Sequence, residues 1–253
     1  MAGNHVEQKK TVKGGSPYSG NREYFDRFPD SLLSVGADAK TSHGVEKENV
    51  LTGVMYLAPA DLSGQNLCPY AKRAGCVSCC LQDAGRKRME GPQLAALRRT
   101  LFMQQYPDLF WATLRRDCTA LVAKARREGL TPAVRLNGTS DLLWEKYPEF
   151  IALHAEFPAI RWYDYTKYPK RNVPKWYDLT FSYSGKKEFL PIVARQTIGR
   201  MAVVFRHALP KRFKGKKVRN GDKHDARFKE PRNSMIGLLA KGRAKTDLSG
   251  FVV

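Results

Sequence analysis

Short apolar runs and longer helical patterns alternate along this chain, and the alternation restricts its fold more than any other feature. The expected strands are 49–57, 133–137, 160–166, 179–183, 201–206 and 236–240. The expected helices begin at Pro92 and Pro107, the second ending before Gly129, and two more span 144–157 and 187–198. Strands separated by helices indicate right-handed βαβ units. We therefore expect an α/β fold, a partial (β/α) barrel of about six mostly parallel strands, with an open doubly wound sheet as the alternative.

The two ends of the chain differ in composition. Residues 1–47 are polar with few apolar runs, so we expect a flexible N-terminal arm. Residues 48–253 should form a single α/β domain, because 42% hydrophobic residues in a 253-residue chain can fill one core. The start of the chain lacks the apolar run of a secretory signal, and no stretch is long and apolar enough to span a bilayer. These features predict a cytoplasmic protein with no membrane contact.

Four of the five cysteines, Cys68, Cys76, Cys79 and Cys80, lie in one loop after the first long expected strand. Disulfides in an exported protein would be spread along the chain, whereas a tight group in a reducing compartment indicates metal binding. Soft thiolates bind zinc, copper(I) or iron–sulfur clusters. Zinc usually takes its ligands as two separated pairs, and this loop has a single pair two residues apart. An iron–sulfur cluster is therefore the favoured cofactor, with structural zinc as the alternative.

Not all five cysteines are expected to serve the same purpose. Cys79 and Cys80 are adjacent, which makes them awkward ligands to one ion, so one of the two should stand outside the ligand set. Cys118 lies in a helical pattern and is expected to be a small buried hydrophobic residue.

Polar and small residues follow several expected strands, at the ends where chemistry collects in α/β barrels. The first such group, after residue 136, is Asn137-Gly138-Thr139-Ser140-Asp141. In an enzyme, the residues that position substrate or move protons would be Asp141, Asp164, Lys167 and Arg206. The alternative is ordinary turn and cap chemistry at each strand end.

The formal net charge of +20 predicts attraction to a polyanion, and nucleic acid is favoured over a membrane surface. The expected phosphate contacts lie in the densest basic run and are Lys211, Arg212, Lys214, Lys216, Lys217 and Arg219. A disordered, solvated linker is the alternative for this run. Asn220-Gly221 fits the apex of a hairpin. The nearby Asp222, His224 and Asp225 are spaced closely enough to bind a metal or to pair with Arg227.

Several of these motifs together resemble the phage "gene product 88" family, which is named from a mycobacteriophage gene and has no firmly assigned function. The matching segments are Cys68-Pro-Tyr-Ala71, Cys80-Leu, Val134-Arg-Leu-Asn-Gly-Thr-Ser-Asp141, Tyr163-Asp-Tyr-Thr-Lys167 and Gly221-Asp-Lys-His-Asp-Ala-Arg227. The resemblance covers about residues 48–253. It implies that Cys68, Cys76 and Cys80 are the preferred ligands, that Cys79 is the extra cysteine, and that the protein is phage-encoded and works in the host cytoplasm.

The layout is also similar, more distantly, to radical S-adenosylmethionine enzymes, which carry a three-cysteine cluster loop after the first strand of a partial α/β barrel. That similarity implies a 4Fe-4S cluster, S-adenosylmethionine as a further cofactor, and redox or radical activity. The residues in the place of the methionyl-binding motif are Asn137, Gly138, Thr139 and Ser140. The chain departs from those enzymes in that motif and in its longer first cysteine gap.

Overall fold

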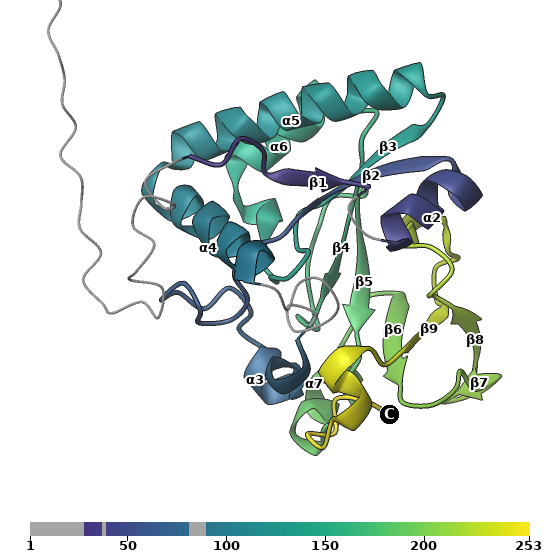
Figure 1. Ribbon diagram of the computed structural model, residues 1–253. Coiled ribbons are helices and arrows are strands. Elements are labelled where there is room, and N and C mark those ends of the chain that lie inside the picture. The colour runs from purple at the N-terminus through teal and green to yellow at the C-terminus, as the bar shows by residue number, and fades with distance from the viewer. Residues whose placement is uncertain (1–27, 37–38, 81–89) are drawn as a thin grey trace, which may run out of the picture.

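The computed structural model describes residues 28–36, 39–80 and 90–253. It is an α/β fold in which the sheet order is β1-β2-β3-β4-β5-β6-β9-β8-β7 (Figure 1). The strands are β1 Leu33–Val35, β2 Val50–Met55, β3 Thr131–Arg135, β4 Arg161–Thr166, β5 Tyr177–Ser182, β6 Arg200–Phe205, β7 Arg212–Phe213, β8 Lys216–Asn220 and β9 Met235–Leu239. The helices are α2 Ala39–Glu48, α3 Ala71–Ala74, α4 Glu90–Gln105, α5 Pro107–Arg127, α6 Pro148–Glu156 and α7 Leu190–Ala194.

The six expected strands are confirmed as β2, β3, β4, β5, β6 and β9, and each lies parallel to the next in that order. Chain order matches spatial order because each crossover returns the next strand to the same side of the previous one. The α/β class and the mostly parallel sheet are therefore confirmed. The barrel is not, because the nine-stranded sheet stays open, ending in antiparallel β1 at one edge and the β7–β8 hairpin at the other.

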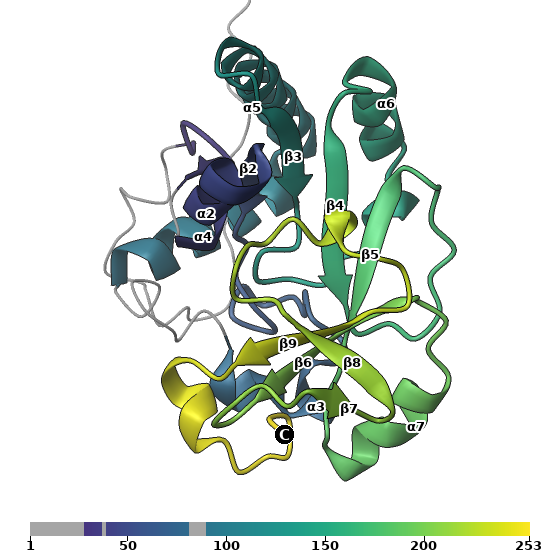
Figure 2. The ribbon, with the colours of Figure 1, turned by 90° about the vertical axis from the view of Figure 1, so that its right-hand side faces the viewer.

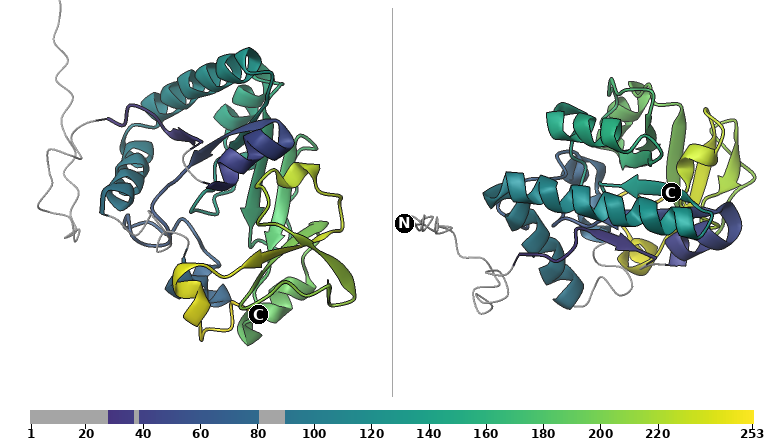
Figure 3. Two further views of the ribbon diagram at one scale, coloured as in Figure 1. Left: turned by 45° about the vertical axis from the view of Figure 1, so that its right-hand side comes forward. Right: turned by 90° about the horizontal axis from the view of Figure 1, so that it is seen from above.

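Helices cover one face of the sheet. Leu51, Val134 and Trp162 point to this face and share a buried cluster with Phe110 of α5 and Phe150 of α6. The Phe150 and Trp162 rings meet edge to face with their centroids 5.0 Å apart. Figure 3 shows α5 running across the sheet when it is seen from above. None of the helices in the described residues is both long and apolar enough to cross a bilayer.

The opposite face is covered by the long connection between β8 and β9. Val50, Ala133 and Tyr163 alternate with the helix-facing residues along their strands, as the two-residue period of a strand requires. They pack with Ala226 and Phe228 of the connection, which crosses in front of β4 and β5 in Figure 2. One face of the sheet is thus covered by helices and the other by the connection between β8 and β9.

The expected N-terminal arm contains ordered elements from residue 33 onward. Leu32 and Leu33 are buried, and their backbone N–H groups donate to Asp117 Oδ2 of α5 at 2.6 and 3.0 Å. A pair of leucines is too short a run to predict a strand, and the carboxylate that holds it lies 84 residues further along the chain. Residues 1–27 lie outside the described part of the chain.

The hairpin suggested with Asn220-Gly221 at its apex is wrong, because β8 ends at Asn220 and pairs with β9 in parallel; a hairpin forms earlier, between β7 and β8. The turn is Lys214-Gly215, with φ angles of +47° and +76° that match a tight hairpin turn. Gly221 lies against β9 instead: its N–H donates to Gly237 O at 2.8 Å, and an added Cβ would sit 2.3 Å from Ile236 Cγ2. Glycine is needed there for close approach of the two chains.

Candidate functional site

The cysteine loop is joined to the carboxyl-terminal edge of the sheet. Cys68 Sγ lies 3.4 Å from the carbonyl oxygen of Thr139, in the loop that follows β3. The N–H of Asp141 donates to Leu67 O at 2.8 Å, and the Cys68 N–H is held by Asn66 Oδ1 at 2.9 Å. The loop after β2 and the loop after β3 therefore meet at the first cysteine.

A turn at Gly75 brings Cys76 back toward the same edge. Gly75 ends α3 with φ +78°, and an added Cβ would lie 2.5 Å from Ser249 Oγ. Cys76 Sγ lies 3.6 Å from Ala71 O, and Cys76 packs against a buried cluster that includes Phe251. This cluster belongs to the C-terminal segment, residues 240–253, which follows β9. Glycine is thus required both for the turn and for the contact with that segment.

The thiols of the loop interact electrostatically with one another and with the expected catalytic residues. Burial, with smaller contributions from the charges of Asp141, Cys80 and Cys76, raises the pKa of the Cys68 thiol to about 12, although a hydrogen bond from the backbone of Ala60 opposes the rise. Burial also raises the pKa of Cys76, which Lys167 opposes. Cys68 and Cys76 are consequently protonated at neutral pH, and any metal that binds them must displace those protons.

A preformed metal site is not visible in the described residues. In the part of the chain that the structure describes, which excludes the side chain of Cys79, no three His, Cys, Asp or Glu residues are arranged to hold a metal ion. Cys68, Cys76 and Cys80 are partly buried, and Cys118 is fully buried in α5 as expected.

The loop 137–140, expected to bind a cofactor, uses its polar side chains to hold its own shape. Asn137 Oδ1 accepts hydrogen bonds from Ser140 Oγ at 2.9 Å and Trp144 Nε1 at 3.0 Å. The Thr139 hydroxyl donates to Leu57 O at 2.5 Å. Gly138 lies so close to β2 that an added Cβ would be 2.4 Å from Met55 O. The polar side chains of this loop are therefore occupied by hydrogen bonds within the protein.

Asp141 and Lys167 are brought together as expected, with an arginine that the sequence did not single out. Asp141 Oδ2 accepts the Lys167 N–H at 2.8 Å, and Arg171 Nη1 lies 3.6 Å from Asp141 Oδ1. Asp141 Oδ1 is buried, and no hydrogen bond reaches it from the described residues. Arg171 is only 1% exposed and is fixed by Glu145 Oε1 at 3.0 Å from its Nε. Burial raises the pKa of Asp141, and Arg171 opposes the rise.

The Lys167 ammonium is bound at the end of β5, whereas the Lys167 backbone N–H binds Asp141. The ammonium donates to Ser182 Oγ at 2.8 Å and lies 4.7 Å from the centre of the Phe251 ring. The C-terminal segment therefore lies over this lysine. Phe251 and Ser249 could not have been assigned to the site from local sequence, because they reach it from the far end of the chain.

Asp164 is part of the same buried group but faces the core. Its two carboxylate oxygens accept the Asn137 N–H and the Tyr177 hydroxyl, each at 2.7 Å. Burial raises the pKa of Asp164 to about 7. Arg206 belongs elsewhere: its guanidinium donates to Lys245 O and Asp247 O, both at 2.7 Å, and so secures the C-terminal segment.

The raised pKa of Asp164 predicts a pH-dependent stability. The folded state favours the protonated acid, so this contribution is complete below the ordinary pKa of 3.8 and is lost as the pH rises through about 7. Asp164→Asn should therefore gain stability relative to wild type between pH 5 and pH 8, by on the order of 2 kcal/mol. Urea denaturation at both pH values measures the difference. Asp61→Asn, at an exposed position, is the control, and an equal pH dependence in both variants would contradict the assignment.

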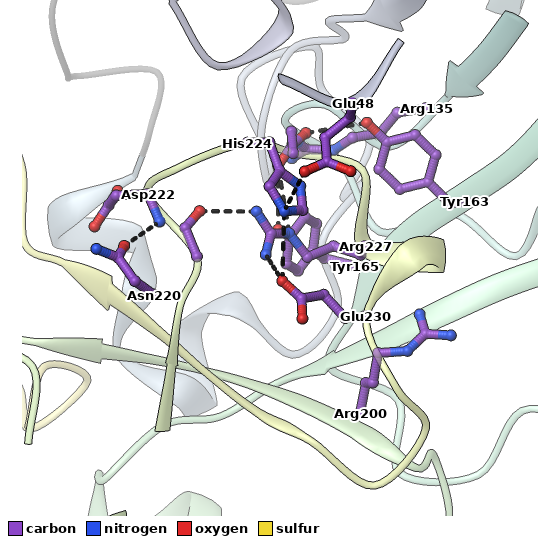
Figure 4. A network of polar contacts seen from close by, with 12 residues as sticks. Glu48, Arg135, Tyr163, Tyr165, Arg200, Asn220, Asp222, His224, Arg227 and Glu230 are labelled. Carbon is purple, nitrogen blue, oxygen red and sulfur yellow. Dashed lines mark hydrogen bonds and ion pairs between the residues drawn. The ribbon is translucent and has the colours of Figure 1, made fainter. Parts of the chain in front are cut away.

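A second polar cluster underlies this site on the loop-covered face of the sheet (Figure 4). Arg135 Nη1 pairs with Asp225 Oδ2 at 2.9 Å, and its Nη2 donates to Gly138 O at 3.3 Å. The hydroxyls of Tyr163 and Tyr165 donate to Asp225 at 3.2 and 3.1 Å. Arg135 thus connects the 221–227 motif to the loop 137–140 of the candidate site.

The alternative in which Asp225 pairs with Arg227 is confirmed, with 4.0 Å between Asp225 Oδ1 and Arg227 Nε. His224 lies between Glu48 and Glu230, with its Nε2 at 3.4 and 3.6 Å from their carboxylates. Asp222 Oδ2 accepts the Leu239 N–H at 2.8 Å. Within the described residues these groups do not form a metal site, so the metal alternative for this motif gains no support.

The basic run forms the edge of the sheet. Phe213 anchors the β7–β8 hairpin through edge-to-face contacts with Tyr183 and Phe205, at 5.5 and 5.3 Å between ring centroids. The cations expected to contact nucleic acid are all exposed: Lys211, Arg212, Lys214, Lys216, Lys217 and Arg219. The disordered-linker alternative is wrong for this segment, because β8 pairs with β9 in parallel.

The chain was compared with protein families, with curated proteins and with solved structures. The family described as Gene product 88 matches residues 31–253, which include β1 and the whole sheet. No curated protein and no solved structure matches the chain.

Proposed function

The chain belongs to the Gene product 88 family, and we propose that it is an iron–sulfur protein that acts on nucleic acid. The observation that carries the proposal is the meeting of two loops at the carboxyl-terminal edge of the sheet. There Cys68 Sγ lies 3.4 Å from Thr139 O, beside the buried carboxylate of Asp141. Carboxyl-terminal strand ends are where α/β proteins place their ligands.

The proposed ligands are Cys68, Cys76 and Cys80, with Cys79 as the extra cysteine. Their donor chemistry suits a soft metal centre. One further feature supports a bound group here: the buried Asp141 Oδ1, which no hydrogen bond reaches from the described residues. When bound, a 4Fe-4S cluster would supply redox chemistry.

The surrounding residues have separate proposed roles. Asp141, held by the Lys167 N–H, would orient or accept a proton from a polar group of the substrate. The Lys167 ammonium would keep the site positive while Phe251 excludes water from it. S-adenosylmethionine is a proposed second cofactor, supported by the chain-order strand arrangement and by the position of the cysteine loop. It would meet the backbone of 137–140.

Anaerobic purification with iron, acid-labile sulfide and zinc measured together tests this proposal. Iron and sulfide in similar amounts, with a visible charge-transfer absorption band, are expected. Stoichiometric zinc without sulfide would replace the proposal by the second candidate, a nucleic-acid-binding protein with a structural zinc site, for which the same thiols serve. A protein that contains neither iron nor zinc would contradict both candidate functions.

The proposal that the protein acts on nucleic acid is supported by its positive charge. Exposed cations on the hairpin and a net charge of +20 predict that binding releases counterions from the nucleic acid. The affinity for a labelled oligonucleotide should therefore fall by on the order of a thousandfold between 50 and 200 mM salt if about six phosphates are contacted. Fluorescence anisotropy across that range measures it. Absence of binding at low salt would remove nucleic acid from the proposal.

A further inference from the structure

Two hollows flank β8, and the side chains of Lys217 and Arg219 line both. The first, of about 300 Å³, lies between β8 and the turn before β9. We call it the cationic hollow, and its lining residues are Lys216, Lys217, Arg219, Pro231, Arg232, Asn233 and Ser234. No carboxylate is among these lining residues, so no negatively charged residue in the lining offsets the positive charge of its lysines and arginines.

The second hollow, of about 370 Å³, has a different charge balance. Glu48 and Glu230 line it together with Lys217, Lys223 and Lys229. Glu48 is already paired with Lys229, at 3.3 Å between Oε2 and Nζ. Glu230 likewise lies 3.9 Å from Arg219 through its Oε2. Arg219 lines both hollows, so its pair with Glu230 reduces the positive charge of each. Glu48 and Glu230 line the second hollow alone, which leaves the cationic hollow with the larger net positive charge.

We propose that the cationic hollow binds consecutive phosphates of a nucleic-acid backbone, with Arg232 as a contact that the basic run of the sequence does not include. The inference rests on the nucleic-acid part of the proposed function. In the described residues Lys216, Lys217 and Arg232 make no ion pair, so their charges are available to an anion. Lys217 and Arg219 are two apart on one strand, and their Cα atoms are about 7 Å apart, close to the spacing of neighbouring phosphates.

The backbone holds these cations in fixed positions. β8 pairs with β9 through Val218 and Met235, and with β7 through Lys217 and Arg212. Val218 points inward against Gly237, where an added Cβ would lie 2.6 Å from Val218 Cγ1. Little ordering of the backbone is therefore needed when an anion binds, which favours affinity.

The hollow recognises phosphate and not bases. No Phe, Tyr, Trp or His is among the lining residues of the cationic hollow, so stacking of bases on an aromatic ring does not contribute there. Phosphate contacts fix position without reading sequence. Binding through this surface is therefore independent of sequence, for DNA and RNA alike.

Lysines on an edge strand also oppose association between sheets, and this role could account for the charge by itself. Protection of the sheet edge requires only that cations be present on the edge strand, whereas phosphate binding requires the particular cations that line the cationic hollow. A variant that removes hollow charges, matched by one that removes equal charge elsewhere, separates the two roles.

The test compares Lys217→Gln/Arg232→Gln with Arg126→Gln/Arg127→Gln, which removes two exposed cations from the end of α5. Affinity for a labelled duplex is measured by anisotropy at several salt concentrations. The hollow variant should lose on the order of tenfold to a hundredfold at 0.1 M salt, and its salt slope should become shallower by about 1.8. The α5 variant should keep the wild-type slope. Equal thermal melting of the three proteins excludes a folding defect.

Any one of four results would overturn the inference. Equal losses in the two variants would mean that only overall charge matters. Undiminished binding by the hollow variant, with wild type binding normally, would place the contact elsewhere while leaving the proposed function intact. Binding to anionic phospholipid vesicles that exceeds binding to nucleic acid, and is lost in the hollow variant, would assign the hollow to a membrane surface. Failure of wild type to bind nucleic acid would instead reject the nucleic-acid part of the proposed function as well.

Discussion

Cys68→Ser is expected to remove nearly all iron and sulfide from the anaerobically purified protein, whereas Cys118→Ser should leave both unchanged. Cys68 lies where the loops after β2 and β3 meet, and serine is a poor ligand for a soft metal centre. Cys118 is an apt control because it is also a buried free thiol but lies in α5, within the apolar core. Cys76→Ser should match Cys68→Ser.

The adjacent pair adds a sharper comparison. Cys80→Ser should lose the cluster and Cys79→Ser should retain it, if Cys79 is the extra cysteine. Iron and sulfide per chain, with the visible spectrum, measure the outcome, and thermal melting checks the fold. Retention of iron in both Cys68→Ser and Cys76→Ser would reject the cysteine loop as the metal site. Metal loss in Cys118→Ser would show that the assay reports folding and not ligation.

Much of the sheet could be predicted because most residues of its central strands are buried. A run such as Val50–Met55, buried at every position, is recognisable without knowing its neighbours. β1 could not be predicted, since its three residues depend on hydrogen bonds from the Leu32 and Leu33 N–H groups to distant Asp117. The hairpin apex was misplaced because Asn-Gly is a strong turn signal, whereas Gly221 is required for close packing on Ile236.

Part of the candidate site could also be predicted from the sequence. Residues at the ends of neighbouring parallel strands must share an edge, so Asp141 and Lys167 could be grouped from their places after β3 and β4. Arg171 and Phe251 contact that pair from segments without strand or motif signals, and only tertiary packing brings them there. Arg206 follows β6, but its guanidinium is used by C-terminal carbonyl groups.

In the 221–227 motif, one ion pair could be predicted from sequence spacing, but a shorter one could not. Sequence spacing suggested Asp225 with Arg227, and that pair exists at 4.0 Å. The shorter contact is with Arg135 of β3, 2.9 Å away and 90 residues earlier in the chain. An isolated arginine between Val134 and Leu136 was the available signal, because a charge inside a buried strand needs a partner.

Asp225→Ala is therefore expected to be among the most destabilising single changes in this protein. It leaves Arg135 and the fully buried Arg227 without their shared carboxylate, and it removes the acceptor of the Tyr163 and Tyr165 hydroxyls. Removing one partner of a buried ion pair costs about 3 to 5 kcal/mol, which corresponds to a fall in Tm of about 10 °C for a chain of this size. Thermal and urea denaturation measure it.

The matched control is Asp61→Ala, which removes the same group from an exposed position and should change Tm little. Combining Asp225→Ala with Arg135→Met should recover part of the loss, because the cost comes from an uncompensated buried charge and not from the missing contact. A double variant as unstable as the sum of the two single variants would contradict that explanation. Because Arg135 also donates to Gly138 O, Asp225→Ala should in addition weaken metal retention, which Asp61→Ala should not.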